Sequence, residues 1–136
     1  MVAYNRALTV RTTAQRQLID ITQDAVKFVD DCNVQEGLLT VSVPHATAAI
    51  IANEHESGLL RDILQRLENL FPESANYLHN RIDDNAHSHI AASFLGHARS
   101  FPIINHQLIR GTWQNIFVVE LDGPRSRRTV NITIVG

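Results

Sequence analysis

Apolar and polar residues alternate at both ends of the chain, and this alternation constrains the fold more than any other feature. A period of two places every second side chain on one face of a strand, whereas a helix repeats every 3.6 residues. Residues 4–12 and the residues from 130 to the C-terminus therefore predict two half-buried strands. The aligned positions are Tyr4, Arg6, Leu8 and Val10 in the first and Val130, Ile132 and Ile134 in the second.

Helical spacing of apolar residues replaces this alternation in the middle of the chain. A helix is predicted over residues 17–29, with an apolar stripe formed by Leu18, Thr22, Val26 and Val29. A second helix begins with Ser57 as its cap and stops at Pro72. A short third helix is predicted over residues 85–96, with Phe94 on its core side.

Four further apolar segments are typical of strands. They cover residues 38–43, residues 48–52, residues 100–104, and residues from 108 onward into 113–121. Periodicity alone does not separate the short run 48–52 from a buried turn of helix. Strands at both ends, with two or three helices between them, predict a single compact α+β domain over residues 1–136 with a mixed or antiparallel sheet.

The overall composition excludes several classes of protein. The 136 residues are 44% hydrophobic and 19% charged, which is typical of a globular chain and not of a disordered one. A net charge of −2 and a pI near 6.4 give no general attraction to nucleic acid or anionic membranes. The first residues do not resemble a signal peptide, and the single cysteine, Cys32, excludes an intrachain disulfide. A cytoplasmic protein without nucleic-acid or membrane partners is expected.

Histidine is unusually frequent, with seven residues in the chain. Three imidazoles with an open fourth position are a common way to hold a catalytic zinc ion, and the candidate ligands are His45, His79 and His89. Their spacing matches no short zinc motif, so ordinary loop histidines are the alternative. On a helix His87 and His89 diverge by about 200°, so only one can point inward, and the position beside Ile90 favours His89.

Two other polar groups lie where loops follow strands, which is a common place for functional side chains. Asn53 and Glu54 end an apolar run, and a plain turn with a capping Asn is the alternative. Arg125 follows a Gly–Pro turn, and Arg127 and Arg128 come directly after it. Guanidinium groups pair with phosphate or carboxylate, although a solvated turn whose charges offset nearby acids would use the same residues.

Three blocks of the sequence, taken together, are similar to those of a known family. They are His45-Ala46-Thr47-Ala48 with Asn53-Glu54; Tyr77-Leu78-His79 with Asp84-Asn85 and Ser88-His89-Ile90; and Gly111-Thr112-Trp113-Gln114-x-Ile116 with Glu120-x-Asp122-Gly123-Pro124-Arg125. The chain resembles the YjbQ-like family, usually described as secondary thiamine-phosphate synthases, along essentially its whole length. The third block is long and specific, whereas the individual histidines are not. Ala46 departs from the family pattern, in which Thr is usual, and removes a hydroxyl near the proposed site.

The resemblance implies an α+β fold assembled as a homotrimer, with a histidine-rich cleft near the subunit boundary. It also implies that His45, His79 and His89 bind a divalent metal ion, with zinc as the candidate. Trp113 is expected in the core or, with its neighbours, in the trimer interface. His87 is extra to the family pattern and is expected to be exposed.

The activity that the resemblance implies joins a pyrimidine diphosphate to a thiazole phosphate and releases pyrophosphate. A site for this reaction must stabilise the negative charge that develops on the leaving diphosphate. The residues expected to act are Glu54 as general base, Asn53, Gln114 and Glu120 beside it, and Arg125 and Thr47 on the phosphorylated substrate. Two alternatives stay open: metal-dependent hydrolysis of a small metabolite, and a non-catalytic trimeric protein that binds a small anion.

Overall fold

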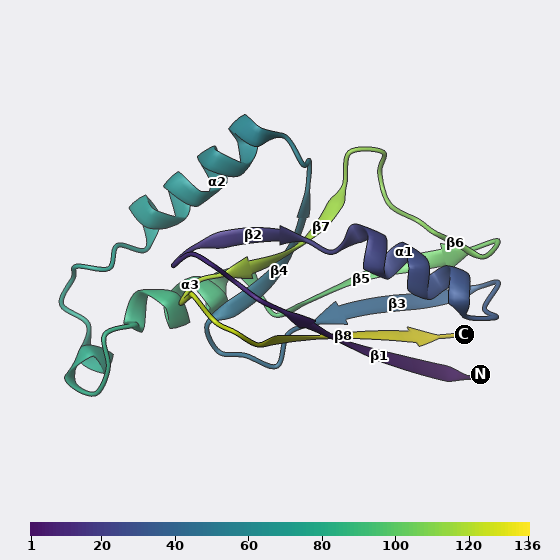
Figure 1. Cartoon of the computed structure of the whole chain (residues 1–136), viewed down its shortest axis with the longest axis horizontal. Helices are drawn as coiled ribbons and strands as arrows, with labels where there is room; N and C mark the ends of the chain where they lie inside the picture. The colour runs from purple at the N-terminus through teal and green to yellow at the C-terminus, as the bar shows by residue number, and fades with distance from the viewer.

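The computed structural model describes residues 1–136 as eight β-strands, three α-helices and one short 3₁₀ helix (Figure 1). In chain order they are β1 (Ala3–Val10), β2 (Gln17–Asp20), α1 (Thr22–Asp31), β3 (Gly37–Ser42), β4 (Ala48–Asn53), α2 (Ser57–Leu70), η1 (Leu78–Arg81), α3 (Ala86–Leu95), β5 (Ala98–Ile104), β6 (Gln107–Leu108), β7 (Asn115–Glu120) and β8 (Arg128–Val135). This arrangement confirms the α+β fold class expected from the sequence. None of the helices is both long and apolar enough to cross a membrane.

The larger of two antiparallel sheets joins both ends of the chain. Its strand order is β1-β8-β3-β5-β6. β1 pairs with β8 along its whole length, from Ala3 opposite Val135 to Val10 opposite Arg128, so the termini lie side by side (Figure 1). The two predicted alternating segments are therefore neighbours, and the alternation is confirmed because every second residue of β8 is buried.

The smaller sheet, ordered β2-β7-β4, is the middle layer of the molecule. One face, which carries Ile50 and Val118, packs in the main core against α1 and the larger sheet. The other face, which carries Ala49 and Val119, packs against α2 and α3. A strand covered on both faces needs apolar side chains at successive positions, which explains why the run 48–52 does not alternate.

The helix predicted over residues 17–29 is wrong in its first part, because residues 17–20 form strand β2. Leu18 and Ile19 pair with β7, and this strand pairing overrides the helical spacing. Asp20 then ends the strand, and its carboxylate accepts hydrogen bonds from the amide and the hydroxyl of Thr22. Helix α1 therefore begins at Thr22, five residues later than expected.

Two local predictions about the helix cap and the C-terminal strands are also wrong. Glu56, and not Ser57, caps α2, because its carboxylate accepts hydrogen bonds from two amides of the first turn. Residues 109–114 form a loop between β6 and β7 where one long strand was expected. Trp113 lies in this loop with 70% of its surface exposed, so it is not part of the core of the chain.

Helix α3 presents a different face to the core than its large residues suggest. Phe94, expected on the core side, is 78% exposed, whereas Ala91 and Ala92 are buried against the smaller sheet. Short side chains allow the helix backbone to lie close to β4 and β7. The apolar positions that count for packing are therefore alanines, and the aromatic residue is left on the outside.

A buried ion pair connects the two sheets. Glu120 at the end of β7 has no exposed surface, and both of its oxygens accept hydrogen bonds from the Arg128 guanidinium at the start of β8. The Thr12 hydroxyl donates a hydrogen bond of 2.7 Å to Glu120, and Arg128 donates to both oxygens of Thr47. Burial alone would raise the pKa of Glu120, but these hydrogen bonds outweigh it and hold the pKa below its usual value.

Replacing Glu120 with glutamine should destabilise the fold strongly, because it leaves the buried charge of Arg128 without a counter-ion. A loss of about 3–5 kcal/mol in the free energy of unfolding is expected for breaking such a pair. Urea denaturation gives this value directly. The matched control is Asp31→Ala, which breaks exposed ion pairs with Arg6 and Lys27 and should cost much less, because water screens such pairs. Equal losses for the two variants would contradict a structural role for Glu120.

Candidate functional site

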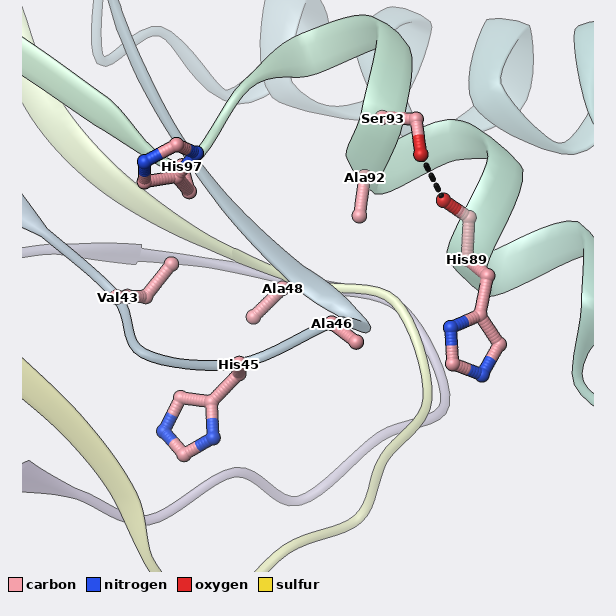
Figure 2. Close-up of a pocket in the computed structure, with 8 residues that line it drawn as sticks. All are labelled: Val43, His45, Ala46, Ala48, His89, Ala92, Ser93 and His97. Atoms are coloured by element: carbon pink, nitrogen blue, oxygen red, sulfur yellow. Dashed lines mark hydrogen bonds between the residues drawn. The ribbon is translucent and has the colours of Figure 1, made fainter.

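A cavity of about 320 Å³ lies between the loop that precedes β4 and helix α3. Its lining residues are Val43, His45, Ala46, Ala48, His89, Ala92, Ser93 and His97. Figure 2 shows the imidazoles of His45, His89 and His97 at separate corners, with small side chains between them. The cavity therefore has an apolar floor and a rim of ring nitrogens.

His89 belongs to a second hollow as well, which lies between α3 and η1. This hollow measures about 530 Å³ and includes His79, Tyr77 and Ile90 in its lining. The rings of His79 and His89 meet edge to face with their centroids 4.7 Å apart. Two of the three predicted metal ligands are thus in contact, and His89 connects them to the cavity that contains His45.

A chain of hydrogen bonds fixes the ring of His79. The His79 Nε2 lies 3.1 Å from the Asn85 amide oxygen, and the Asn85 amide nitrogen donates to the Asp122 carboxylate at 2.9 Å. Because the amide nitrogen must face the carboxylate, the amide oxygen faces His79, and Nε2 must carry the proton. The free lone pair of a neutral His79 is therefore on Nδ1, as in a histidine oriented for metal binding.

Asp122 is the charged end of this chain and also holds Arg125. Burial alone would raise the pKa of Asp122, but hydrogen bonds from Asn85 and Arg125 lower it below its usual value. The Arg125 guanidinium donates to the Asp122 carboxylate and to its carbonyl, both at 2.9 Å. Arg125 is exposed, so its remaining donors can still meet an anion.

His45 is held by a different contact. The amide of Thr129 donates a hydrogen bond of 2.8 Å to its Nε2, so in the neutral ring the proton is on Nδ1. Burial, followed by the positive charge of Arg128, lowers the pKa of His45 and favours this neutral form. While the Thr129 contact holds, the lone pair of Nε2 accepts the Thr129 amide and Nδ1 carries the proton, so neither nitrogen is free to bind a metal. His45 is instead oriented to donate a hydrogen bond from Nδ1.

Of the two histidines of α3, His87 and not His89 is the more deeply buried, which is the reverse of the prediction. His87 is only 2% exposed, so the predictions that it is exposed and that His89 is the inward-pointing residue are wrong. Its Nε2 lies 3.3 Å from the Ser88 hydroxyl, which itself donates to the carbonyl of Leu121. The alanine face of α3 turns this histidine inward. His89 is left on the flank of the helix, where it borders both hollows.

The donor set fits part of a zinc site. His79 and His89 are in contact, and His79 presents a nitrogen with a free lone pair. No group of three or more His, Cys, Asp or Glu side chains in the chain is arranged to hold a metal ion. The residues present thus bring together two candidate imidazole ligands, and a complete metal site would need further ligands from outside this set.

The remaining predicted site residues fall into two places. Thr47 and Glu120 are buried in the ion-pair network that joins the sheets, and their oxygens are used there. Asn53, Glu54 and Gln114 lie at the other end of the smaller sheet, where the Asn53 oxygen accepts from the Glu54 amide. The length of β4 separates this end from His45, so one chain does not bring the two groups together.

Sequence reasoning missed a pair at that second end. The His55 Nδ1 lies 2.6 Å from the Asp20 carboxylate, which also accepts hydrogen bonds from Asn115 and Thr22. Burial alone would raise the pKa of Asp20, but these hydrogen bonds lower it to about 2. The only sequence signal was the Asp20-Ile21-Thr22 pattern at the start of α1, which is typical of a helix start.

The comparisons with known proteins agree along the whole chain. The family profile described as "UPF0047 protein YjbQ-like" matches residues 6–136. A UPF0047 protein of Methanothermobacter thermautotrophicus is 43% identical over 136 residues, which is 100% of this chain and 94% of that protein. The UPF0047 protein YugU of Bacillus subtilis is 32% identical over 132 residues, covering 96% and 98% of the two chains.

Solved structures show the same architecture. A YbjQ-like protein of unknown function from Sulfolobus solfataricus superposes with a TM-score of 0.98 at 47% identity and covers 99% of this chain and 98% of its own. A hypothetical protein from Aeropyrum pernix has a TM-score of 0.94 at 38% identity and covers 98% of each chain. The two-sheet arrangement that positions the histidines is therefore shared by these proteins.

The depressed pKa of Asp20 predicts a specific loss of stability in acid. A carboxyl whose pKa falls from 3.8 unfolded to about 2 folded stabilises the fold above the unfolded value. That contribution, about 2 kcal/mol, is lost as the pH falls from about 4 to about 2. Unfolding free energies of wild type and Asp20→Asn, measured across this range, should converge at low pH. Curves that stay parallel would contradict the assignment.

Proposed function

The chain belongs to the UPF0047 family of YjbQ-like proteins, and from this premise we propose that it binds a divalent metal ion at His79 and His89 and acts on a phosphorylated small molecule. The observation that carries the proposal is the hydrogen-bond chain from Asp122 through Asn85 to His79. Such a chain fixes both the tautomer and the orientation of an imidazole, which is a common arrangement behind metal-binding histidines.

The phosphorylated substrate would complete the coordination. Two imidazoles leave positions for oxygen ligands, and phosphate or diphosphate oxygens suit a divalent ion, with zinc as the first candidate. When bound, the ion stabilises negative charge on the substrate oxygens. His45 would donate a hydrogen bond from Nδ1 to the same anion across the cavity, and Arg125 would use the donors that Asp122 leaves free.

Transfer of a pyrimidine group from its diphosphate to a thiazole phosphate is the reaction that this site would serve. The residues of the chain would bind the diphosphate and hold the developing charge as pyrophosphate leaves. The thiazole nitrogen would form the new C–N bond as the C–O bond to the diphosphate breaks. This nitrogen carries no proton and becomes positively charged, so the role left for Glu54, which was expected to be the general base, is to stabilise that positive charge with its carboxylate. Within one chain, however, Glu54 lies beyond the far end of β4 from His45. It would therefore have to reach the histidine cavity from a second copy of the chain.

A homotrimer would allow that approach and is supported by the exposed apolar surface around η1 and α3. Leu78, Ile82 and Phe94 are 73%, 86% and 78% exposed, and they lie close to the histidines in sequence. Trp113 adds a fourth large exposed side chain on the loop before β7. Closed cyclic assembly of three copies would bury such groups and bring the two ends of the smaller sheet together.

The metal proposal predicts that His79→Ala and His89→Ala each lose most of the zinc affinity. The same variants should lose pyrophosphate release from the pyrimidine diphosphate in the presence of the thiazole phosphate. Calorimetric titration of chelator-treated protein with zinc measures the first effect, and a coupled pyrophosphate assay measures the second. Loss of an oriented ligand or of its orienting partner typically lowers metal affinity 10-fold or more, and Asn85→Leu should therefore lower it by about 10- to 100-fold.

The matched control is His106→Asn, because this imidazole lies in a turn far from α3 and Asn tolerates its positive φ of 61°. It should keep both zinc binding and turnover. Equal zinc affinity in wild type and the His79 and His89 variants would contradict the metal site. Pyrophosphate release that needs no thiazole phosphate would favour the hydrolase alternative. Zinc and anion binding without turnover would favour the binding protein.

The assembly proposal predicts a light-scattering mass of three chains of 15.2 kDa at micromolar concentration. Phe94→Ser should shift the mass toward the monomer, because it removes a large exposed apolar group from the proposed interface. Val2→Ser is the control, since Val2 is also exposed but lies outside the strands at the N-terminus. A monomeric wild-type protein would contradict the trimer.

A further inference from the structure

A second candidate site lies between the start of β2 and helix α2. Two hollows meet there, of about 560 and 460 Å³, and both include Arg16 and Glu68 in their lining. Figure 1 shows that the start of β2 and the C-terminal half of α2 lie at the same end of the molecule. None of the residues that line these hollows belongs to the histidine site.

Arg16 is the unusual residue of this region. Its Nη2 atom is buried and has no hydrogen-bond partner, and the guanidinium takes part in none of the five ion pairs of the chain. A buried donor without an acceptor is costly, and native proteins contain few of them. Arg61 of α2 lines the larger hollow and is also free of ion pairs, so two arginines without a carboxylate partner border the same space.

The only other buried side-chain nitrogen without a partner is in the same neighbourhood. It is the Nδ1 of His87. The positive charge of Arg16 acts on this ring, so the two unsatisfied polar atoms of the interior belong to neighbouring residues.

The lining carries acidic groups beside the two arginines. Asp62 and Glu68 face the larger hollow, and Glu68 and Glu73 face the smaller one. These carboxylates would repel a simple anion but would accept hydrogen bonds from an ammonium group. A ligand that carries both a negative and a positive group would pair with the arginines and with the carboxylates at the same time.

We propose that the hollows around Arg16 and Glu68 bind a small zwitterion that carries a phosphoryl or carboxylate group and an ammonium group. The oxyanion would accept from Arg16 and Arg61, whose forked donors match such groups bidentately. The ammonium group would lie against Glu68 and Asp62 or Glu73. This site is independent of the histidines and of the activity proposed for them.

Calorimetric titration of the chelator-treated full chain tests the proposal with defined probes. O-phosphoethanolamine and β-alanine carry both charges, whereas inorganic phosphate and ethanolamine carry one each. At least one zwitterion should bind at least about 10-fold more tightly than either single-charge probe, and the better of the two identifies the oxyanion. Equal affinity for the zwitterions and phosphate, or no measurable binding of any probe, would overturn the proposal.

Variants then test the residues. Arg16→Ala and Arg61→Ala should each weaken zwitterion binding about 10- to 100-fold, the effect of losing one charge-assisted hydrogen bond. Arg61 is exposed, so its variant keeps the test decisive if Arg16→Ala folds poorly. Glu68→Gln should reduce the preference for the zwitterion over phosphate. Arg66→Ala is the matched control on the same helix, because Arg66 lines neither hollow, and His79→Ala should also bind normally. Wild-type affinity in both Arg16→Ala and Arg61→Ala would overturn the site.

Discussion

The buried pair of Glu120 and Arg128 is the interaction on which the rest of the structure depends. It joins the end of β7 to the start of β8, and so it sets the position of one sheet relative to the other. Glu120 also accepts hydrogen bonds from the amides of Leu121 and Asp122. The backbone that carries Asp122 is thereby fixed, and Asp122 in turn orients Asn85 and His79. The position of the His79 ring in the candidate site therefore depends on the buried Glu120–Arg128 ion pair.

The middle position of the smaller sheet explains where polar chemistry can occur. Both faces of this sheet are covered by apolar side chains, so a polar group within its strands must be fully paired, as Glu120 is by Arg128 and Thr12. His45 precedes β4, whereas His55 follows it and contacts Asp20, the last residue of β2. The two polar groups therefore lie at opposite ends of β4. A single chain thus carries two separate polar clusters, which the smaller sheet holds apart.

The sequence predicted the elements whose pattern is decided locally and failed where packing decides. The alternation of β1 and β8 could be read directly, because one face of each strand is more deeply buried than the other along its length. The apolar run of β4 was typical of a strand, but its sequence left a buried turn of helix open, because both of its faces are covered. Strand β2 has only four residues, and its pairing with β7 is invisible in its own sequence. For the histidines, periodicity showed that His87 and His89 face apart. It could not show which one is buried, because alanines define the inner face of α3. The contact of His55 with Asp20 joins residues 35 positions apart, and no local signal announces it.

The pairing of β1 with β8 has a consequence for how fast this chain reaches its native state. The side chains of Asn5 and Thr133 are in contact although 128 positions separate them. Strand β8 also lies between β1 and β3. The larger sheet therefore stays incomplete until β8, from the C-terminal end of the chain, has paired with β1 and β3 from its N-terminal part. Topologies dominated by such distant contacts lose more chain entropy before any contact energy is gained, and they fold on the millisecond-to-second scale. Until that closure, β3 has an unpaired edge that can pair with other chains, and association during refolding competes with the native register.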